Sequence, residues 1–390
     1  MDFYLEPELE LVRKLSREFA LNNFDESIAK YIDEREEFPF DLYREAARHR
    51  LLRPSIPDEY GGGGLNMLAE AIVHEEFNRV DSTLGQSILS GAFGSKLIYQ
   101  YGREDQRIKY LRKVLSGDSV MYAAFTEPEH GSDITHLSTK AVRKGDIWII
   151  NGVKTFITNA PIADFGVVLC QMESVDGKPY RNQVMFIVES DMQGVSINPM
   201  KGKMGQRGSP IGELVLKDVE LGDEYVLGEV GRGFYQALEF FNYGRVRAAA
   251  NAVGMALNAF DKAIEYASSR KQFDRPIIEF QAVSHKLAVM SQFIEAARLL
   301  TYRAAWSLDR QDIEKRVKAS YAAIAKRFST EYMWIVIDMA LQIFGGYGYM
   351  RDFKLERLLR DSRVLRIYEG TSEILNEVIV NNLRKGTFWL

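Results

Sequence analysis

Glycine and proline are distributed unevenly along this chain, and their distribution limits the folds that it can adopt. Of the 30 glycines in 390 residues, 15 fall between residues 117 and 233. Beyond residue 233 there is a single proline, Pro276. Proline interrupts helices and glycine marks turns, so a shift of this kind indicates domain boundaries. The length itself allows about two or three domains of ordinary size.

The segments on either side of the glycine-rich middle have the apolar spacing of helices. Large apolar residues recur every three or four positions near the start of the chain and again beyond residue 280, as in amphipathic helices. Long helices with such stripes pack together as bundles. The stripes are formed by Leu5, Leu9, Val12 and Phe19; by Val283, Leu287, Met290, Ile294 and Ala297; and by Val317, Tyr321, Ile324 and Phe328.

The middle third has the pattern of short strands instead. Its β-branched and aromatic runs cover 147–150, 165–169, 184–188 and 213–219, and turn residues bound them at Asn151-Gly152, Asp176-Gly177, Gly194 and Gly222-Asp223. We therefore predict an α+β architecture: an N-terminal all-α domain over 1–117, a central antiparallel β-barrel or sandwich over 118–232, and a C-terminal helix bundle over 233–390.

Charge and composition exclude several classes of protein. Lys and Arg number 50 and Asp and Glu 54, which gives a net charge of -4 and argues against a nucleic-acid-binding protein. No apolar run reaches the ~20 residues of a spanning helix, so we expect no membrane insertion. The single cysteine, Cys170, cannot form an intrachain disulfide.

The first residues do not have the composition of a targeting segment. Four acidic residues precede the first basic one, Arg13, unlike a secretory signal or an Arg-rich transit peptide. We expect a cytoplasmic protein, or a mitochondrial-matrix protein if the chain is a processed eukaryotic one. Of the five histidines, the closest pair is His130 and His136, whose spacing of six does not suit metal ligation, so we expect no metal site.

Two polar segments with aromatic residues remain as candidate sites. Thr126, Phe156 and Thr158 could place an aromatic face and hydroxyl groups around a flat heteroaromatic cofactor. Thr371 or Ser372 could cap a helix that runs to about Arg384. By residue type alone, two alternatives remain open. The strand with Phe156 and Thr158 could simply face the core of its domain, and Glu369 could be an exposed acid in a loop.

Six motifs in order along the chain strongly resemble the acyl-CoA dehydrogenase family, FAD flavoproteins that oxidise acyl-CoA thioesters to 2-enoyl-CoA. The resemblance runs over nearly the whole chain and implies the three-part architecture given above, with a four-helix bundle as the C-terminal domain over 233–390. The motifs are Phe125-Thr126-Glu127-Pro128-x-x-Gly131-Ser132-Asp133, Phe156-Ile157-Thr158-Asn159, Met204-Gly205-Gln206-Arg207, Arg270-Lys271-Gln272-Phe273, Gln342-Ile343-Phe344-Gly345-Gly346-Tyr347-Gly348 and Ile367-Tyr368-Glu369-Gly370-Thr371-Ser372.

The resemblance implies that Glu369 is the catalytic base, which removes the α-proton while the β-hydride passes to flavin N5. A carboxylate in a pocket emptied of water has a raised pKa and is a stronger base. The thioester oxygen would be polarised by the backbone N–H of Glu369 and a flavin ribityl hydroxyl. Some relatives carry the base just before the family's arginine, here Arg245, but that position is Gly244 in this chain.

The resemblance also implies the remaining site residues and the partners. Electrons would pass to an electron-transferring flavoprotein, and the adenine half of FAD would lie across a subunit interface in a homotetramer built as a dimer of dimers. Phe156 stands where many members have Trp, and Glu373 where some have Gln. FAD would contact Phe125, Thr126, Ser132, Phe156, Thr158, Arg270, Phe273, Gln281, Gln342, Gly345, Gly346, Thr371 and Glu373. The acyl-CoA would contact Ser132, Asn242, Arg245, Tyr368 and Gly370.

Residues 81–85 lack the arginine that glutaryl-CoA relatives carry for a distal carboxylate, so a neutral acyl group is favoured, of open length and branching. Two other functions remain open. A flavin-dependent oxidase or monooxygenase on the same fold would be reoxidised rapidly by air, although monooxygenase relatives lack the glutamate. A non-catalytic acyl-CoA-binding protein would be colourless.

Overall fold

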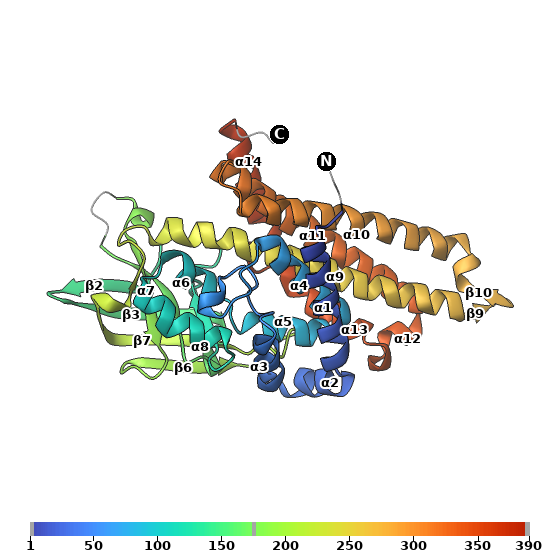
Figure 1. Cartoon of the computed structure of the whole chain (residues 1–390), viewed down its shortest axis with the longest axis horizontal. Helices are drawn as coiled ribbons and strands as arrows, with labels where there is room; N and C mark the ends of the chain where they lie inside the picture. Colours follow the sequence, from blue (N-terminus) through green and yellow to red (C-terminus); the bar gives the residue numbers. More distant parts are fainter. Residues whose placement is uncertain (1–3, 174–176, 387–390) are drawn as a thin grey trace.

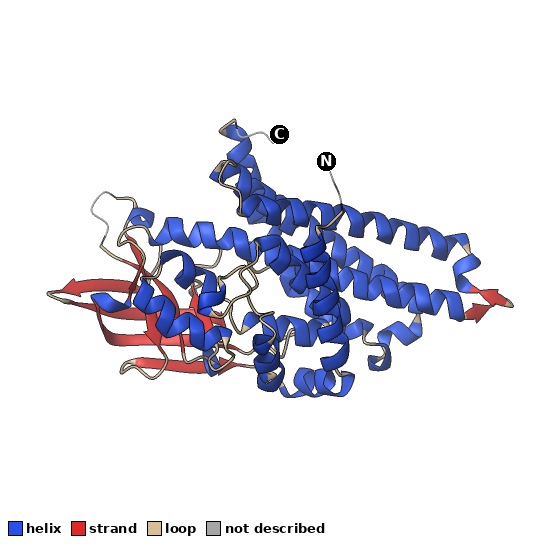
Figure 2. Cartoon of the chain, in the orientation of Figure 1, coloured by secondary structure: helices blue, strands red, loops and turns tan. Residues whose placement is uncertain are grey.

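The computed structural model describes residues 4–173 and 177–386. Helices form its N-terminal and C-terminal parts, and strands form the part between them (Figures 1 and 2). The predicted α+β architecture is confirmed at this level. Within the described ranges, none of the helices combines the length and the apolar character that a membrane crossing requires.

The N-terminal part contains only helices and turns, as predicted. In its first helix, Leu9 and Phe19 of the predicted stripe are buried. The helices α4 and α5 are buried along most of their length, and both contact the long helix α9 of the C-terminal part. The helices are α1 (Pro7–Asn23), α2 (Glu26–Arg35), α3 (Phe40–Arg48), α4 (Met67–Val80), α5 (Ser82–Ser90), α6 (Ser95–Tyr101), α7 (Glu104–Gln106) and α8 (Arg112–Leu115).

The middle part is one twisted sheet of eight strands in the order β6-β7-β3-β2-β4-β5-β8, with β1 paired to β4. Most pairings are antiparallel, but β1 runs parallel to β4, and β2 meets β4 in parallel at Lys140 and Gln171. The strands are β1 (Met121–Ala124), β2 (Lys140–Lys144), β3 (Ile147–Thr158), β4 (Phe165–Gln171), β5 (Gln183–Glu189), β6 (Val195–Met200), β7 (Ile211–Gly222) and β8 (Val226–Leu227).

The dipeptide Asn151-Gly152 does not form the predicted turn. Strand β3 continues through it to Thr158, and the register against β7 shifts between Ile150 and Gly152. The side chain of Asn151 hydrogen-bonds Asp218 on β7, accepting from its backbone N–H at 2.9 Å. A β-bulge thus absorbs the residues that favour a turn. The predicted turn at Asp176-Gly177 begins outside the described residues.

Long helices form the C-terminal part. The 37 residues of α9 give a rod about 55 Å long at 1.5 Å per residue. The shorter helices α13 and α14 contact α11. A small hairpin follows α9. The elements are α9 (Gly233–Ser269), β9 (Lys271–Gln272), β10 (Arg275–Pro276), α10 (Gln281–Leu308), α11 (Lys315–Phe344), α12 (Gly346–Tyr349), α13 (Leu355–Ser362) and α14 (Ser372–Arg384).

The stripe predicted on α10 is largely buried, whereas that on α11 is only partly so. Leu287, Met290, Ile294 and Ala297 of α10 are buried. On α11, Ile324 and Phe328 are half-buried, and the fully buried face is formed by small residues such as Ala322 and Ala325. Small side chains let α11 approach α9 closely, which a pattern of large apolar residues does not reveal.

Candidate active site

Glu369 lies in a sharp turn between α13 and α14. Its backbone φ is 55° and that of Gly370 is 88°, so two consecutive residues adopt the left-handed conformation. Thr371 begins α14 as its N-cap, and its hydroxyl accepts from the Ile374 N–H at 3.2 Å. The predicted cap and the predicted helix end at Arg384 are confirmed. The turn therefore fixes the direction of the Glu369 side chain.

The carboxylate of Glu369 rests directly against Gly244 of α9. A Cβ atom at position 244 would lie 2.3 Å from Glu369 Oε2, so no other residue fits there without moving the carboxylate. Oε2 itself is buried and has no hydrogen-bond partner among the described residues. Buried polar atoms are normally paired, so an orphaned carboxylate oxygen indicates a group that acts on something outside the chain.

Burial raises the pKa of Glu369 to about 7, although three cations oppose the shift, from Arg245, Arg247 and Lys326. Arg245 Nε makes a long hydrogen bond of 3.5 Å to the Glu369 carbonyl, and its Nη1 donates to Asn242 Oδ1 at 3.0 Å. Neither arginine donates to the carboxylate. A carboxyl group with a pKa near neutrality can take up or release a proton under physiological conditions.

Beside Glu369, a polar chain leads from Tyr368 into the N-terminal helices. Burial raises the pKa of Tyr368, whose hydroxyl lies among Asn251, Gln206 and Gln86. Asn251 on α9 donates to Gln86 Oε1 at 3.0 Å, and its Oδ1 accepts from His74 Nδ1 at 2.8 Å and Asn78 Nδ2 at 2.9 Å. The helices α4, α5 and α9 are thus joined by hydrogen bonds immediately behind Tyr368.

The loop that carries Thr126 is held against strand β3. The Thr155 N–H donates to the Thr126 carbonyl at 3.0 Å. The buried Lys154 ammonium donates to the Phe125 carbonyl at 3.0 Å and to Glu127 Oε1 at 2.8 Å. These contacts bring the loop beside Phe156, whose side chain is 61% exposed and whose φ is 57°.

The other predicted residues of this loop differ in exposure. The Phe125 ring is buried in the core, 5.9 Å from the ring centre of Phe240 and 5.0 Å from that of Phe241. Ser132 is exposed, and Thr126 and Thr158 are half-buried. The structure thus places the Thr126 loop beside the strand segment that carries Phe156 and Thr158, while the Phe125 ring packs in the core.

Six of the predicted FAD contacts lie at the other end of the molecule, near the β9–β10 hairpin (Figure 1). We call them the distal set: Arg270, Phe273, Gln281, Gln342, Gly345 and Gly346. A surface pocket of about 650 Å³ is lined there by Arg270, Phe273 and Gly346 together with Tyr266, Phe280 and Phe344. Gln281, Gln342 and Gly345 are exposed nearby in sequence. Phe125 packs near the start of α9 and Arg270 follows its end, so about 45 Å of helix separates the two sets.

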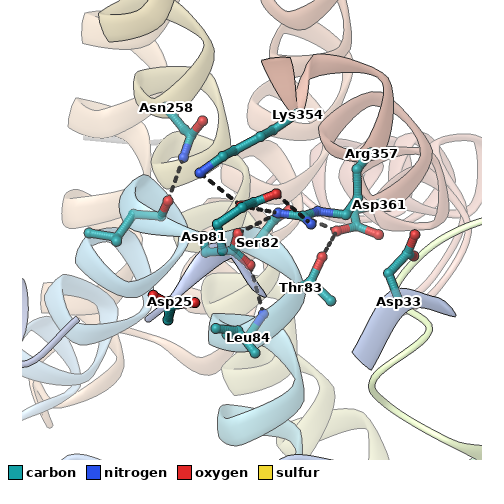
Figure 3. Close-up of polar contacts among 12 residues, drawn as sticks. Asp25, Asp33, Asp81, Ser82, Thr83, Leu84, Asn258, Lys354, Arg357 and Asp361 are labelled. Atoms are coloured by element: carbon teal, nitrogen blue, oxygen red, sulfur yellow. Dashed lines mark hydrogen bonds and ion pairs between the residues drawn. The ribbon is translucent and has the colours of Figure 1, made fainter. Parts of the chain in front are cut away.

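A buried junction joins the three parts of the chain, and Figure 3 shows its contacts between the N-terminal helices and α13. Asp361 of α13 accepts from the hydroxyls of Ser82 and Thr83, both at 2.8 Å, and from the Gln206 N–H at 2.6 Å. Arg357 donates to Asp81 at 2.7 Å in the same cluster. Gln206 belongs to the motif Met204–Arg207, for which the sequence predicted no role. In the structure it connects α13 to the surroundings of Tyr368.

Sequence reasoning missed several residues that the structure brings to the site. Gln206 stood within a recognised motif, so the motif itself was the signal. Lys326 stands on the small-residue face of α11, four positions after Ala322, and a lone cation on a buried stripe is the signal that could have identified it. Asn251 and Gln86 lie within helices and carry no local signal. Among the described residues, no group of metal-ligating side chains is arranged to hold an ion.

Comparison with known proteins gives a consistent result along the whole chain. Three family models match in order: "Acyl-CoA dehydrogenase, N-terminal domain" over residues 6–118, "Acyl-CoA dehydrogenase, middle domain" over 123–219 and "Acyl-CoA dehydrogenase, C-terminal domain" over 231–383. A 3-(aryl)acrylate reductase of Clostridium sporogenes is 40% identical over 378 residues, which cover 96% of this chain and 98% of the reductase.

Two further similarities concern a partner and a cofactor. The subunit CarC of the caffeyl-CoA reductase-Etf complex of Acetobacterium woodii is 36% identical over 384 residues, covering 98% of this chain and all of CarC. The solved structure of PigA with FAD and proline superposes with a TM-score of 0.93 at 26% identity, and the alignment covers 99% of this chain and all of the other.

Proposed function

The chain belongs to the acyl-CoA dehydrogenase family, and from this premise we propose that it catalyses the α,β-dehydrogenation of an acyl-CoA thioester with Glu369 as the base. The observation that carries the proposal is the Glu369 carboxylate, which is buried against Gly244 with Oε2 unpartnered. Burial strengthens a carboxylate as a base because water no longer stabilises its charge. A thioester α-carbon next to Oε2 would transfer its proton there.

The chain's own groups also support the handling of the thioester. Glu369 and Gly370 form a left-handed turn, and in this proposal the Glu369 N–H donates to the thioester oxygen. Arg245 and Asn242 bond to each other on α9 and form the neighbouring wall. Tyr368 and Gly370 line the turn, and Ser132 is exposed for the CoA portion.

The cofactor in this proposal is FAD, as in the PigA complex. The residues fit it: Phe156 offers an exposed aromatic face, Thr126 and Thr158 offer half-buried hydroxyls beside it, and Thr371 and Glu373 stand at the start of α14. When bound, FAD supplies the acceptor for the β-hydride. Lys154 and Glu127 hold the Thr126 loop in place for it.

A second subunit completes the proposed FAD site. Arg270, Phe273, Gln281, Gln342, Gly345 and Gly346 lie about 45 Å of helix from Phe125, too far to share one dinucleotide with it in the same chain. We propose that they serve the neighbour's cofactor in a homodimer, within a dimer of dimers. An electron-transferring flavoprotein is the proposed acceptor, supported by the Etf complex of which CarC is a subunit.

The reverse reaction is a second candidate, because two similar proteins are named reductases of arylacrylate and of caffeyl-CoA. The same residues would serve it, with Glu369 giving a proton to the α-carbon instead of taking one. The acyl group is then proposed to be a neutral one, aliphatic or aromatic, since residues 81–85 contain no arginine.

The test is an anaerobic titration of the yellow protein with straight, branched and aryl-substituted acyl-CoAs and with the matching 2-enoyl-CoAs. We expect saturated thioesters to bleach the flavin of the unmodified protein. Glu369→Gln should keep FAD, and its bleaching rate should be at least a thousandfold lower. Undiminished bleaching in Glu369→Gln would refute the assignment of the base. Bleached enzyme that is recoloured only by an enoyl-CoA would favour the reductase.

A further inference from the structure

Lys326 is a buried cation directly behind the catalytic turn. It lies on α11 among Ala322, Ala323 and Ala325, and its side chain has no exposed surface. An ammonium group in such surroundings is retained only if it is well partnered. The sequence and the resemblance assign it no role.

The partner of Lys326 is the turn that carries the base. Its Nζ donates to the Gly370 carbonyl at 2.7 Å. The preceding carbonyl, that of Glu369, accepts the 3.5 Å hydrogen bond from Arg245 Nε. Two consecutive carbonyls thus face two buried cations, one from α11 and one from α9, and the orientation of both peptide units is fixed from opposite helices.

The turn needs such support because its conformation is unfavourable. The left-handed region is unfavourable for a residue other than glycine because its Cβ crowds the following carbonyl oxygen, and Glu369 adopts it with φ of 55°. A strained residue at a functional site persists only where its surroundings hold it. The hydrogen bond from Lys326 to the next carbonyl is the shortest of those that the described residues make to the carbonyls of Glu369 and Gly370.

The charges around Lys326 and Glu369 form one coupled group. Lys326 is faced by Glu369 from the turn, Arg245 from α9, Glu331 from its own helix and Glu373 from α14. Burial lowers the pKa of Lys326, and the carboxylates, Glu369 first, oppose that shift and favour the charged ammonium. Glu369 is faced in turn by Arg245 and Arg247 from α9 and by Tyr368 beside it.

We propose that Lys326 is the positioning residue of the base: it holds the Gly370 carbonyl and so keeps Glu369 in its left-handed turn, and its positive charge favours the carboxylate form of Glu369. The role assigned to Glu369 rests on the proposed function. The hydrogen bond and the charge are separable contributions, because a neutral donor preserves the first without the second.

Two variants of the FAD-loaded enzyme separate these contributions. Lys326→Met removes both the donor and the charge, and Lys326→Gln keeps a donor. Lys315→Met is the matched control, since Lys315 is an exposed lysine on the same helix whose ion pair with Glu239 is solvent-accessible. Two readouts are measured across pH: the infrared carboxyl band lost in Glu369→Gln, and the rate of flavin bleaching by acyl-CoA.

The titration midpoint is the pH at which half of the Glu369 carboxyl band is lost. In both Lys326 variants, we expect this midpoint to rise by about one pH unit, a tenfold change in the ionisation constant of Glu369. At pH above that midpoint, Lys326→Gln should recover most of the bleaching rate, while Lys326→Met should stay at least tenfold slower. A midpoint and rates like those of Lys315→Met in both variants would overturn the proposal. If Lys326→Met fails to fold, the midpoint in Lys326→Gln decides.

The infrared titration requires no turnover, which keeps the two proposals distinct. If no thioester bleaches the unmodified enzyme, the proposed function fails, and a raised midpoint in Lys326→Gln still supports the pairing of Lys326 with Glu369. If the unmodified enzyme is bleached and the midpoint does not move, only the role of Lys326 fails.

Discussion

Glu70 and Glu369 each place a buried carboxyl group near Arg247, and their surroundings give these groups opposite properties. Glu70 accepts from Arg247 Nε at 2.6 Å and lies 3.8 Å from Arg53 Nε, and these cations hold its pKa well below its usual range despite burial. Glu369 has an unpartnered oxygen, and burial raises its pKa to about 7. Different surroundings move the pKa values of the two carboxyl groups apart. One group therefore stays ionised while the other can exchange a proton.

The shift at Glu369 predicts the pH dependence of the reaction. The base must be deprotonated before substrate binds, so its folded-state pKa, raised from 4.5 to about 7, sets the pH above which the free enzyme is competent. We expect kcat/KM for flavin reduction to rise about tenfold per pH unit below 7 and to level off above it. Anaerobic stopped-flow measurements across this range check the prediction. A profile already level at pH 5.5 would contradict it.

Gly244→Ala should disable the site without unfolding the protein. The added Cβ would lie 2.3 Å from Glu369 Oε2, so the carboxylate must move, and a displacement near 1 Å at a reacting group costs about a hundredfold in rate. Bleaching rate, FAD content and thermal midpoint are measured together. Loss of FAD in parallel with the rate would mean that position 244 supports the fold, whereas loss of rate alone supports the contact with Glu369.

At the scale of elements, the helices α4, α5 and α9 are joined by polar side chains where a bundle normally has apolar contacts. Asn251 alone bonds His74, Asn78 and Gln86, all of them buried. Beside it, Gln86 Nε2, His74 Nε2 and Asn78 Oδ1 have no partner among the described residues. Buried hydrogen-bond networks fix how helices align against each other. Any shift that breaks one of these bonds leaves a buried polar group unpaired, which costs free energy.

Replacement of Asn251 by Val should therefore destabilise the protein more than an apolar substitution in a helix usually does. The change leaves partners on two other helices without their hydrogen bonds, at a cost of about 2–4 kcal/mol in the free energy of unfolding. Denaturant titration measures it, with Asn198→Val on the exposed strand β6 as the control, expected within about 0.5 kcal/mol. Equal effects of the two changes would refute the role of the network.

The sequence pattern predicted the helices and strands better than it predicted the contacts between them. The strands of the middle part and the cap at Thr371 follow from local turn and capping chemistry, which short segments carry in full. Local chemistry misled at Asn151-Gly152, because pairing with β7 outweighed the preference for a turn. It was silent on Lys326 and Asn251, whose roles depend on helices that are distant in sequence.

At the scale of the whole molecule, the three parts meet where the site is built. Asp361 receives hydrogen bonds from Ser82 and Thr83 of the N-terminal part (Figure 3). It also accepts from Gln206 of the middle part, so α13 holds both parts. A Cβ on Gly205 would lie 2.4 Å from the Arg360 carbonyl carbon, which shows how closely the middle part approaches this helix. The turn with Glu369 follows α13 after a short 3₁₀ helix at Arg363–Arg366, so the position of the base depends on all three parts.

The proposed division of the FAD site between subunits predicts complementation between two inactive variants. A chain with Glu369→Gln has no base but an intact distal set. A chain with Arg270→Glu and Phe273→Ala has an intact base but a damaged distal set, and we expect each homo-oligomer to be inactive. Arg270 and Phe273 lie at the far end of α9 from the Thr126 loop, so their substitution leaves the base and its turn unchanged.

In a mixed dimer, one site combines the intact base of the second chain with the intact distal set of the first. Co-expression of the two chains should therefore restore about a quarter of the unmodified activity per subunit, since half of randomly formed symmetric dimers are mixed and each holds one complete site. Differently tagged chains allow the mixed dimer to be purified and its acyl-CoA bleaching measured. If each chain instead used its own distal set, both sites of the mixed dimer would be incomplete, and activity would stay at the level of the two parent variants.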